Sequence, residues 1–201
     1  ESDFTFRLGG YLMTAGGLGL AAGAANAAVT QINVTQTVTA NNGVQQYDID
    51  INGDTSVDLQ VMVYDNGVGN PGYISIQGQD NTMVHIAQRQ TCSAGEYYAG
   101  NVAPGATIDS TLFGTPTPQA WGFIWSPNRI NDCNNFVTGQ WGTLAFREGT
   151  PGNYIYGYLN VRPGLGSTIL EIDGGAYEST PNTPIAVPDP PMRNESPHTS
   201  W

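Results

Sequence analysis

Residues 47–64, YDIDINGDTSVDLQVMVY, hold two runs in which apolar and polar residues alternate, with an acidic stretch between them. The second run is the clearer, because Leu59, Val61 and Val63 are separated by single polar or larger residues. Successive side chains of a β-strand point to opposite faces, so this period of two predicts strands that bury one face. The stretch therefore predicts two neighbouring strands joined by an acidic loop, and it indicates an all-β fold.

The same period of two recurs along most of the chain after residue 28. Turn residues such as Asn70-Pro71-Gly72 and Thr150-Pro151-Gly152 separate the apolar runs. Many short strands at this spacing are typical of a sandwich of two sheets. We therefore expect an antiparallel β-sandwich, jelly-roll-like in layout, over residues 29–180. The expected strands cover residues 32–38, 47–51, 57–63, 73–77, 82–88, 121–125, 141–148, 153–162 and 167–172.

The composition is that of a turn-rich extracellular protein. Charged residues make up only 11% of the 201 residues, lysine is absent, and the formal net charge is −11. A polyanion such as nucleic acid is repelled by this charge, and the arginines form no cluster that would offset it. Nucleic acid is therefore not expected as a partner.

Residues 1–28 form a signal-peptide-like or assembly segment. Arg7 precedes an apolar stretch rich in glycine and alanine, which ends in Ala25-Asn26-Ala27, an A-x-A-like cleavage site. The glycines and the shortness of the stretch argue against a membrane-spanning helix. We expect a secreted, extracellular protein with no stable membrane anchor. Alternatively, the segment is retained in an assembly as an inserted strand.

The cysteines and the end of the chain fit the same compartment. Cys92 and Cys133 suit one disulfide in an oxidising environment, and their spacing matches no zinc site. Residues 181–201 are rich in proline and polar residues, so they are expected to form a disordered tail.

The acidic stretch between the first two strands is a candidate calcium site. Calcium prefers oxygen ligands, and alternate side chains of a tight loop can supply them. The pattern D-x-[DN]-x-D-x-x-x-D, found in calcium loops between strands, is matched by Asp50, Asn52, Asp54 and Asp58. Thr55 stands where such loops usually place glycine, which tolerates a positive φ. A calcium ion here would hold the loop together and would do no chemistry.

Two other interpretations of this stretch compete with that one. A register beginning at Asp48 matches the opening of an EF-hand loop, but Leu59 then stands in place of the closing glutamate. A plain hairpin with Asn52-Gly53 at its turn is the alternative without a metal. Carboxylates this close together repel one another unless a counter-ion is present, which favours a bound cation.

A row of tyrosines is a candidate sugar-binding platform. Tyr154, Tyr156 and Tyr158 share one face of an expected strand, and exposed aromatic rings combine apolar area with a polar group. The competing interpretation is that the rings cover a sheet or fill the core, since aromatic residues are common in strands.

No catalytic constellation is apparent, and we do not expect an enzyme. A serine-histidine-aspartate triad would have to use His85, in an expected strand, or His198, in the expected tail. No G-x-S-x-G turn is present, and a glycosidase would need two opposed carboxylates that nothing in the sequence pairs.

The chain resembles a group of uncharacterised secreted bacterial β proteins that often carry a PEP-CTERM sorting tail. The resemblance rests on YDIDINGDTSVDLQV, YIYGYLNVR and ILEIDGGAYESTPNTPI, and it spans most of residues 47–190. It implies export and a β-sandwich, and it carries no established enzymatic activity. Val187-Pro188-Asp189-Pro190 is similar to the opening of the sorting tail, but the apolar stretch and basic cluster that should follow are replaced by PMRNESPHTSW.

These features predict a secreted, non-enzymatic structural or surface-matrix protein, as a subunit of an extracellular assembly. Self-association would proceed by adding a strand to the open sheet edge of a neighbour. The alternative function is a carbohydrate-binding module that holds a polysaccharide on its tyrosine row.

Overall fold

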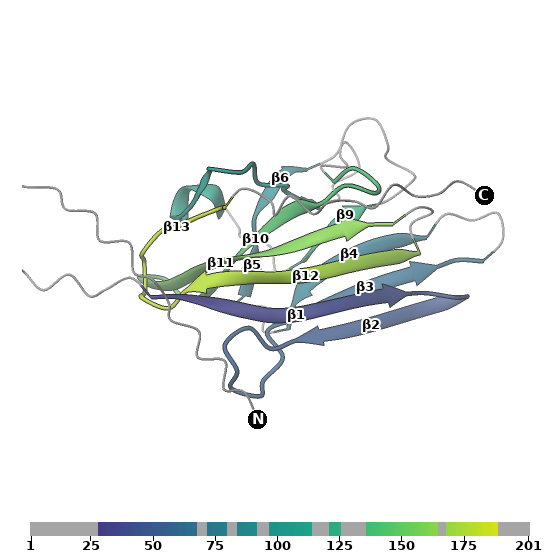
Figure 1. The fold of residues 1–201 in the computed structure, drawn as a ribbon, viewed down its shortest axis with the longest axis horizontal. Coiled ribbons are helices and arrows are strands. Elements are labelled where there is room, and N and C mark those ends of the chain that lie inside the picture. The colour runs from purple at the N-terminus through teal and green to yellow at the C-terminus, as the bar shows by residue number, and fades with distance from the viewer. Residues whose placement is uncertain are drawn as a thin grey trace, which may run out of the picture.

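The computed structural model describes residues 28–67, 72–79, 84–91, 97–113, 121–125, 136–164 and 168–188, and over these the protein is all-β (Figure 1). The strands form three sheets, none of which closes on itself. A short 3-10 helix, η1, covers Ser110–Phe113. The strands are β1 Val29–Thr39, β2 Gly43–Ile49, β3 Leu59–Asp65, β4 Tyr73–Gly78, β5 Val84–Ile86, β6 Gln88–Thr91, β7 Tyr97–Ala99, β8 Thr107–Ile108, β9 Trp121–Trp125, β10 Gly142–Thr150, β11 Asn153–Pro163, β12 Ile169–Glu178 and β13 Ile185–Ala186.

The first sheet has five strands in the order β1-β12-β11-β10-β5, all antiparallel. The hairpins β10–β11 and β11–β12 put its three central strands side by side. The first described strand, β1, pairs with β12 and forms one edge of the sheet. A β-bulge lies between Ile32 and Thr35 of β1, opposite Gly174, whose φ is 67°. A positive φ of this size is easily reached only by glycine.

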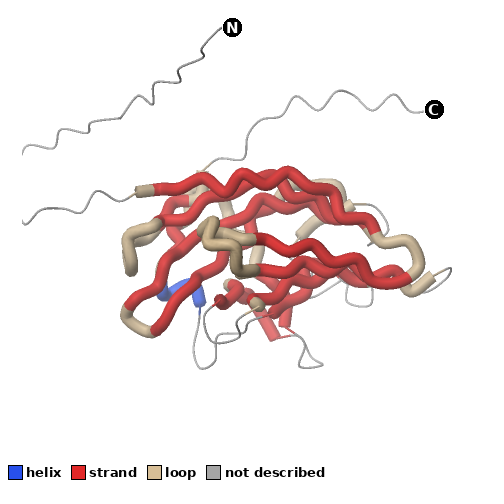
Figure 2. Tube along the Cα trace, turned by 90° about the horizontal axis from the view of Figure 1, so that it is seen from below, coloured by secondary structure: helices blue, strands red, loops and turns tan. Residues whose placement is uncertain are grey.

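The second sheet has six strands in the order β2-β3-β4-β9-β7-β6. Its pairs are antiparallel except for β7 and β9, which are parallel and meet at Tyr98 and Phe123. The tube in Figure 2 shows the long strands running along the long dimension of the molecule, with several of the connecting loops at its ends.

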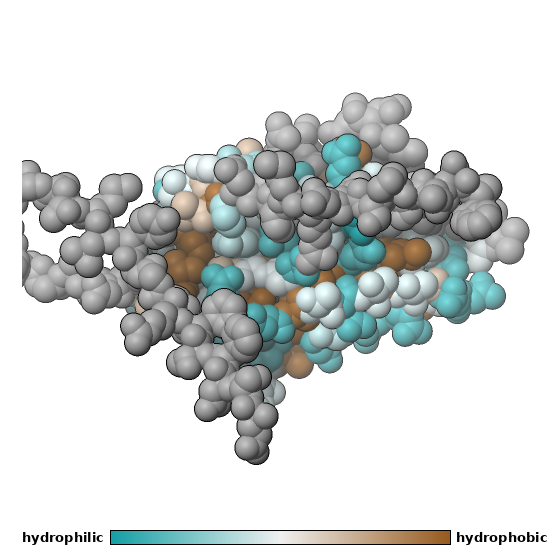
Figure 3. Space-filling model, viewed as in Figure 1, coloured by the Kyte–Doolittle hydropathy of each residue, from teal (hydrophilic) through white to brown (hydrophobic). Residues whose placement is uncertain are grey.

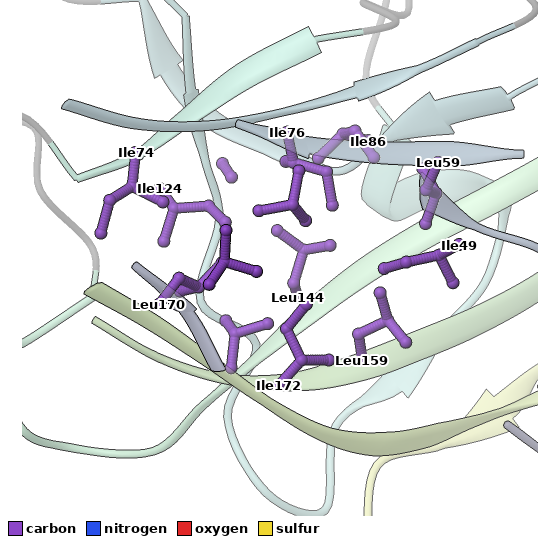
Figure 4. Close-up of a cluster of buried hydrophobic side chains, with 14 of the residues drawn as sticks. Ile49, Leu59, Ile74, Ile76, Ile86, Ile124, Leu144, Leu159, Leu170 and Ile172 are labelled. Atoms are coloured by element: carbon purple, nitrogen blue, oxygen red, sulfur yellow. The ribbon is translucent and has the colours of Figure 1, made fainter. Parts of the chain in front are cut away.

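The inward faces of the two sheets share one apolar cluster. Leu59, Val61 and Ile76 of the six-stranded sheet and Leu144 and Leu159 of the five-stranded sheet are fully buried in it. In Figure 4 the labelled side chains of the two sheets point toward one another between the ribbons. The period of two in the sequence is thus explained by burial of alternate side chains on one face of each strand.

A second, smaller apolar cluster lies on the other face of the five-stranded sheet. There β8, η1 and β13 cover the centre of β11, and Ile108, Phe113, Ile185 and Val187 are buried against it. β8 pairs with β13 as a separate two-stranded sheet (Figure 1).

Sequence-based boundaries differ from the structure at several strands, and three of the differences have a clear physical reason. Residues 181–188 of the expected disordered tail pack on the protein, because the apolar side chains of Ile185 and Val187 are buried there. The strand expected over 82–88 is interrupted at Ala87, since β5 belongs to one sheet and β6 to the other. Val57 belongs to the acidic loop and is 38% exposed, so β3 begins only at Leu59.

Among the described residues, no helix is long and apolar enough to cross a membrane.

Candidate functional site

The acidic loop connects β2 to β3 at one end of the six-stranded sheet. The last strand pair before it is Ile49 with Leu59, and Asp58 donates its N–H to the carbonyl of Ile49 at 3.0 Å. The connection therefore runs from Asp50 to Asp58. The prediction of a tight hairpin turn at Asn52-Gly53 is wrong, because the pairing of β2 with β3 ends at Ile49 and Leu59, before either residue.

The loop is folded around its own carboxylate and amide oxygens. Asp50 accepts the N–H of Gly53 at 2.7 Å and that of Thr55 at 2.8 Å. Asn52 Oδ1 accepts the N–H of Asp54 at 2.9 Å, and Asp54 Oδ1 accepts that of Ser56 at 2.8 Å. Asp50, Asn52 and Asp54 thus each close a turn by accepting an N–H of a residue that follows, as Asp and Asn side chains commonly do.

Thr55 adopts the conformation that the calcium-loop pattern assigns to glycine. Its φ is 75°, in the left-handed region that β-branched residues rarely enter. Counted from Asp50 it is the sixth residue, where calcium loops of the EF-hand type place glycine for a sharp turn. The backbone therefore follows such a loop although the residue that usually permits the turn is missing.

Asp58 is the buried member of the loop. Its side chain is 6% exposed, and Oδ2 accepts the N–H of Ile51 at 2.6 Å. Burial raises the pKa of Asp58, and the charges of Asp54 and Asp50 raise it further, while the bond from Ile51 opposes the shift.

Glu148 comes to this loop from the other sheet. It continues the inward-facing series of Leu144 and Phe146 along β10, and its Oε1 accepts the side-chain N–H of Asn52 at 3.2 Å. Its second oxygen, Oε2, is buried and has no hydrogen-bond partner among the residues that the structure describes. Burial and then the charge of Asp58 raise the pKa of Glu148 to about 7, with smaller contributions from Asp54 and Asp50.

The loop and Glu148 together offer carboxylates and one amide to a hard cation. Oxygen ligands of this kind suit calcium, and a cation would offset both the burial and the mutual repulsion that raise the pKa of Glu148. In the described residues, no three aspartate, glutamate, histidine or cysteine side chains already stand close enough to hold a metal ion. Calcium binding by Asp50, Asn52, Asp54 and Asp58 therefore stays a prediction. The sequence did not predict the place of Glu148 beside the loop, because nothing in its spacing connects it to residues 50–58.

The tyrosine row lies on the outer face of the five-stranded sheet, largely under cover. Tyr156 is 2% and Tyr158 6% exposed beneath the segments that carry β8 and β13. Phe113 stacks on Tyr156 with 6.0 Å between ring centroids. Tyr154 is half-buried, and the guanidinium of Arg147 lies 4.2 Å from its ring centroid. In this structure the three rings are therefore packed against other side chains and do not form an open platform.

A buried polar row crosses the same face. Arg147 of β10 pairs in register with His85 on one side and Tyr156 on the other, and Tyr156 pairs with Glu178. Arg147 Nε donates to His85 Nδ1 at 3.3 Å. Burial, followed by the positive charge of Arg147, lowers the pKa of His85, so this histidine is neutral at pH 7. Glu178 accepts the N–H groups of Ala28 and Thr180 at 2.9 and 2.8 Å.

The outer face of the six-stranded sheet carries a connected series of aromatic rings. The ring centroids of Tyr64 and Tyr73 are 5.0 Å apart, and those of Tyr73 and Phe123 are 5.4 Å apart. Phe123 in turn lies 5.5 Å from both Trp121 and Tyr98. Trp121 is 38% exposed, so this series reaches the surface at its end.

A polar row runs beside these rings. Gln77 Nε2 donates to Gln60 Oε1 at 3.3 Å, and Gln60 Nε2 donates to Asp48 Oδ1 at 2.7 Å. Gln77 is paired in register with Trp121. The sequence did not predict this arrangement, because β3, β4 and β9 become adjacent only when the sheet forms.

The predicted disulfide between Cys92 and Cys133 and the tail histidine His198 lie outside the described residues. Comparison with known proteins identifies no relative: no protein-family model matches the chain, and no curated protein and no solved structure matches it.

Proposed function

We propose that the protein is a secreted, non-enzymatic structural β protein that serves as a subunit of an extracellular assembly. Its two larger sheets are proposed to pack face to face as a β-sandwich, which their shared apolar cluster supports. The connections β2–β3–β4 and β10–β11–β12 are meanders of sequence neighbours, which favours a sandwich of meanders over the Greek keys of a jelly roll.

The observation that carries a structural function is the position of Glu148 beside the acidic loop. The loop belongs to the six-stranded sheet and Glu148 to the five-stranded sheet, so a calcium ion held by both would tie the two sheets together. The buried, unpartnered Oε2 supports this assignment, because a buried carboxylate oxygen normally has a donor or a cation beside it. Calcium is then a structural cofactor that strengthens the protein in a calcium-bearing extracellular setting.

A thermal melt with calcium and with chelator tests this function. A ligand that binds only the folded state stabilises it by about 2.7 kcal/mol at a hundredfold excess over Kd, which raises Tm by several degrees for a domain of this size. Asp54→Asn should abolish the calcium-dependent rise, because it removes a proposed ligand. Asp109→Asn, which removes a carboxylate from the turn before η1, should leave the rise unchanged. An equal Tm with calcium and with chelator would overturn the calcium assignment.

Carbohydrate binding is the second candidate, and the outer face of the six-stranded sheet favours it over the covered tyrosine row. Rings beside amide groups suit a neutral sugar chain, which stacks on the first and hydrogen-bonds to the second. Titration with a neutral oligosaccharide series should change tryptophan fluorescence. Trp121→Ala should then abolish the fluorescence change, and Tyr154→Ala should not. The reverse result would favour the tyrosine row as the sugar-binding site.

A further inference from the structure

The two larger sheets have unequal edges. On one side they end in β1, with 11 residues, and β2, with 7. On the other side they end in β5, with 3 residues, and β6, with 4. Short edge strands are one of the ways in which proteins prevent pairing between molecules. The long edges, β1 and β2, lie near each other along the lower rim in Figure 1.

β1 has few of the features that protect an exposed edge. Its sequence, VTQINVTQTVT, contains no charged residue and no proline. Val29 at its start is 52% exposed. In Figure 3 the right part of this rim is pale to teal, and brown patches lie nearer its middle. The bulge between Ile32 and Thr35 protects the start of the strand, and it leaves Thr35–Thr39 as a regular stretch in register with β12. Within this stretch the side chain of Gln36 donates to the carbonyl of Thr37 at 3.2 Å.

The charge of the molecule decides which edge a second copy can approach. Two copies with a formal net charge of −11 repel each other over most of their surface. β2 ends at the acidic loop and carries Asp48, so pairing β2 with β2 would bring carboxylates of both copies together. β1 carries no charge, and beside it on β12 the carboxylate of Glu171 is in an ion pair with Arg162.

We propose that β1 is a self-association edge, at which Thr35–Thr39 pairs antiparallel with the same residues of a second copy across a two-fold axis. The pairing joins two five-stranded sheets into one continuous sheet and satisfies the outward N–H and C=O groups of both strands. An interface of this kind is isologous, because the same residues contribute from each copy. The inference rests on the proposed structural function and specifies its partner, a second copy of this chain.

The test compares two charge variants of the chain. Thr35→Lys/Thr37→Lys places lysines on the exposed face of β1, in register with Asp173 and Glu171 of β12, so the fold can accept them as cross-strand ion pairs. The matched control, Thr150→Lys/Asn153→Lys, adds the same charge at exposed, mutually paired positions of the β10–β11 turn. Both variants reduce the net negative charge equally, so a difference between them reports on the edge alone.

Sedimentation velocity over a concentration series, up to the millimolar range, measures the association. The wild type and the control should dimerise with the same Kd, and the β1 variant should dimerise at least tenfold more weakly. Hydrogen exchange at Thr35–Thr39 should slow as the concentration rises. A dimer that the β1 variant leaves intact would place the interface elsewhere and overturn the inference.

A chain that stays monomeric at every concentration would also overturn the proposed self-association edge. This holds whether the backbone amides of β1 exchange freely or are protected by another part of the same chain. Running the series with calcium and with chelator separates this failure from a failure of the proposed structural function. A calcium-dependent Tm rise without dimerisation would reject the self-association edge and keep the calcium-stabilised protein.

Discussion

At the scale of single residues, the acidic loop matches the calcium-loop pattern except at Thr55, where a β-branched residue stands in place of glycine. Asp50, Asn52 and Asp54 each close a turn by accepting backbone N–H groups. Thr55 occupies the left-handed region at a φ of 75°. The sequence indicated the position at which the conformation is needed, but it could not show that a threonine adopts it.

Thr55→Gly is expected to stabilise the protein. The substitution relieves a left-handed β-branched residue, which costs roughly 1–2 kcal/mol, and it adds roughly 0.5–1 kcal/mol of chain entropy to the unfolded state. The net gain should be up to about 1 kcal/mol by urea denaturation, with a further gain in calcium if the loop binds it. Thr55→Val, which keeps the branched side chain in the same conformation, should bring no gain. A loss of stability in Thr55→Gly would show that the threonine side chain holds the loop.

Glu148 should make the calcium-free protein less stable as the pH rises. Its pKa is about 7 in the folded chain and 4.5 for the unperturbed group, so the stabilising contribution is complete below pH 4.5 and is lost as the pH rises through 7. Glu148→Gln imitates the protonated form. In chelator at pH 8 it should be more stable than wild type by about 1 kcal/mol, a figure that allows for the partial exposure of the group to water.

With calcium present, the order of the two proteins should reverse. The glutamate would then be paired with the cation, and the glutamine variant would lose most of the calcium-dependent rise in Tm. Melts at pH 5 and pH 8, each with calcium and with chelator, separate the two effects. If wild type were the more stable protein in chelator at pH 8, the carboxylate would already have a compensating partner there.

At the scale of elements, strands with regular alternation were predictable and contacts between distant strands were not. β9 matches its expected range of 121–125, and β11 differs by a single residue at its end. β8 and β13 were missed, because two-residue strands have too few positions for a period to show. The bond between Asn52 and Glu148 joins residues 96 positions apart, and no local pattern could reveal it.

Close approach of the central strands leaves no room for side chains at two glycines. A Cβ on Gly175 of β12 would lie 2.0 Å from the backbone carbonyl oxygen of Tyr158. One on Gly157 of β11 would meet the ring of Phe146 first, at 2.3 Å, and the carbonyl oxygen of Ala176 less closely, at 2.8 Å. A ring can turn aside and a paired backbone cannot. Gly175→Ala should therefore lower the free energy of unfolding more than Gly157→Ala, for which overpacking predicts a loss of about 1–3 kcal/mol.

Urea denaturation of both variants checks this order. The opposite order would mean that β11 and β12 separate more easily than the Phe146 ring can move. Two equal and small losses would mean that the sheet yields at both positions.

At the scale of the whole molecule, the uniform negative charge opposes the association that its uncharged edge permits. Salt screens charges separated by more than the Debye length, which is about 10 Å at 0.1 M ionic strength. Association through β1 should therefore strengthen severalfold between low and high salt. Sedimentation at a fixed protein concentration checks this, and the β1 lysine variant should stay monomeric throughout. An association that weakens with salt would indicate contacts between opposite charges.

The pairing of β1 with β12 also determines when this chain can fold. Val29 is opposite Glu178, and the N–H of Ala28 bonds to a residue 150 positions later. During synthesis, the first described strand has no partner until almost all of the others have been made. Contacts between such distant residues form slowly, because a long loop must close before the pairing repays it. The five-stranded sheet therefore gains its β1 edge only after β12 has left the ribosome, so the last step of its assembly comes late in synthesis.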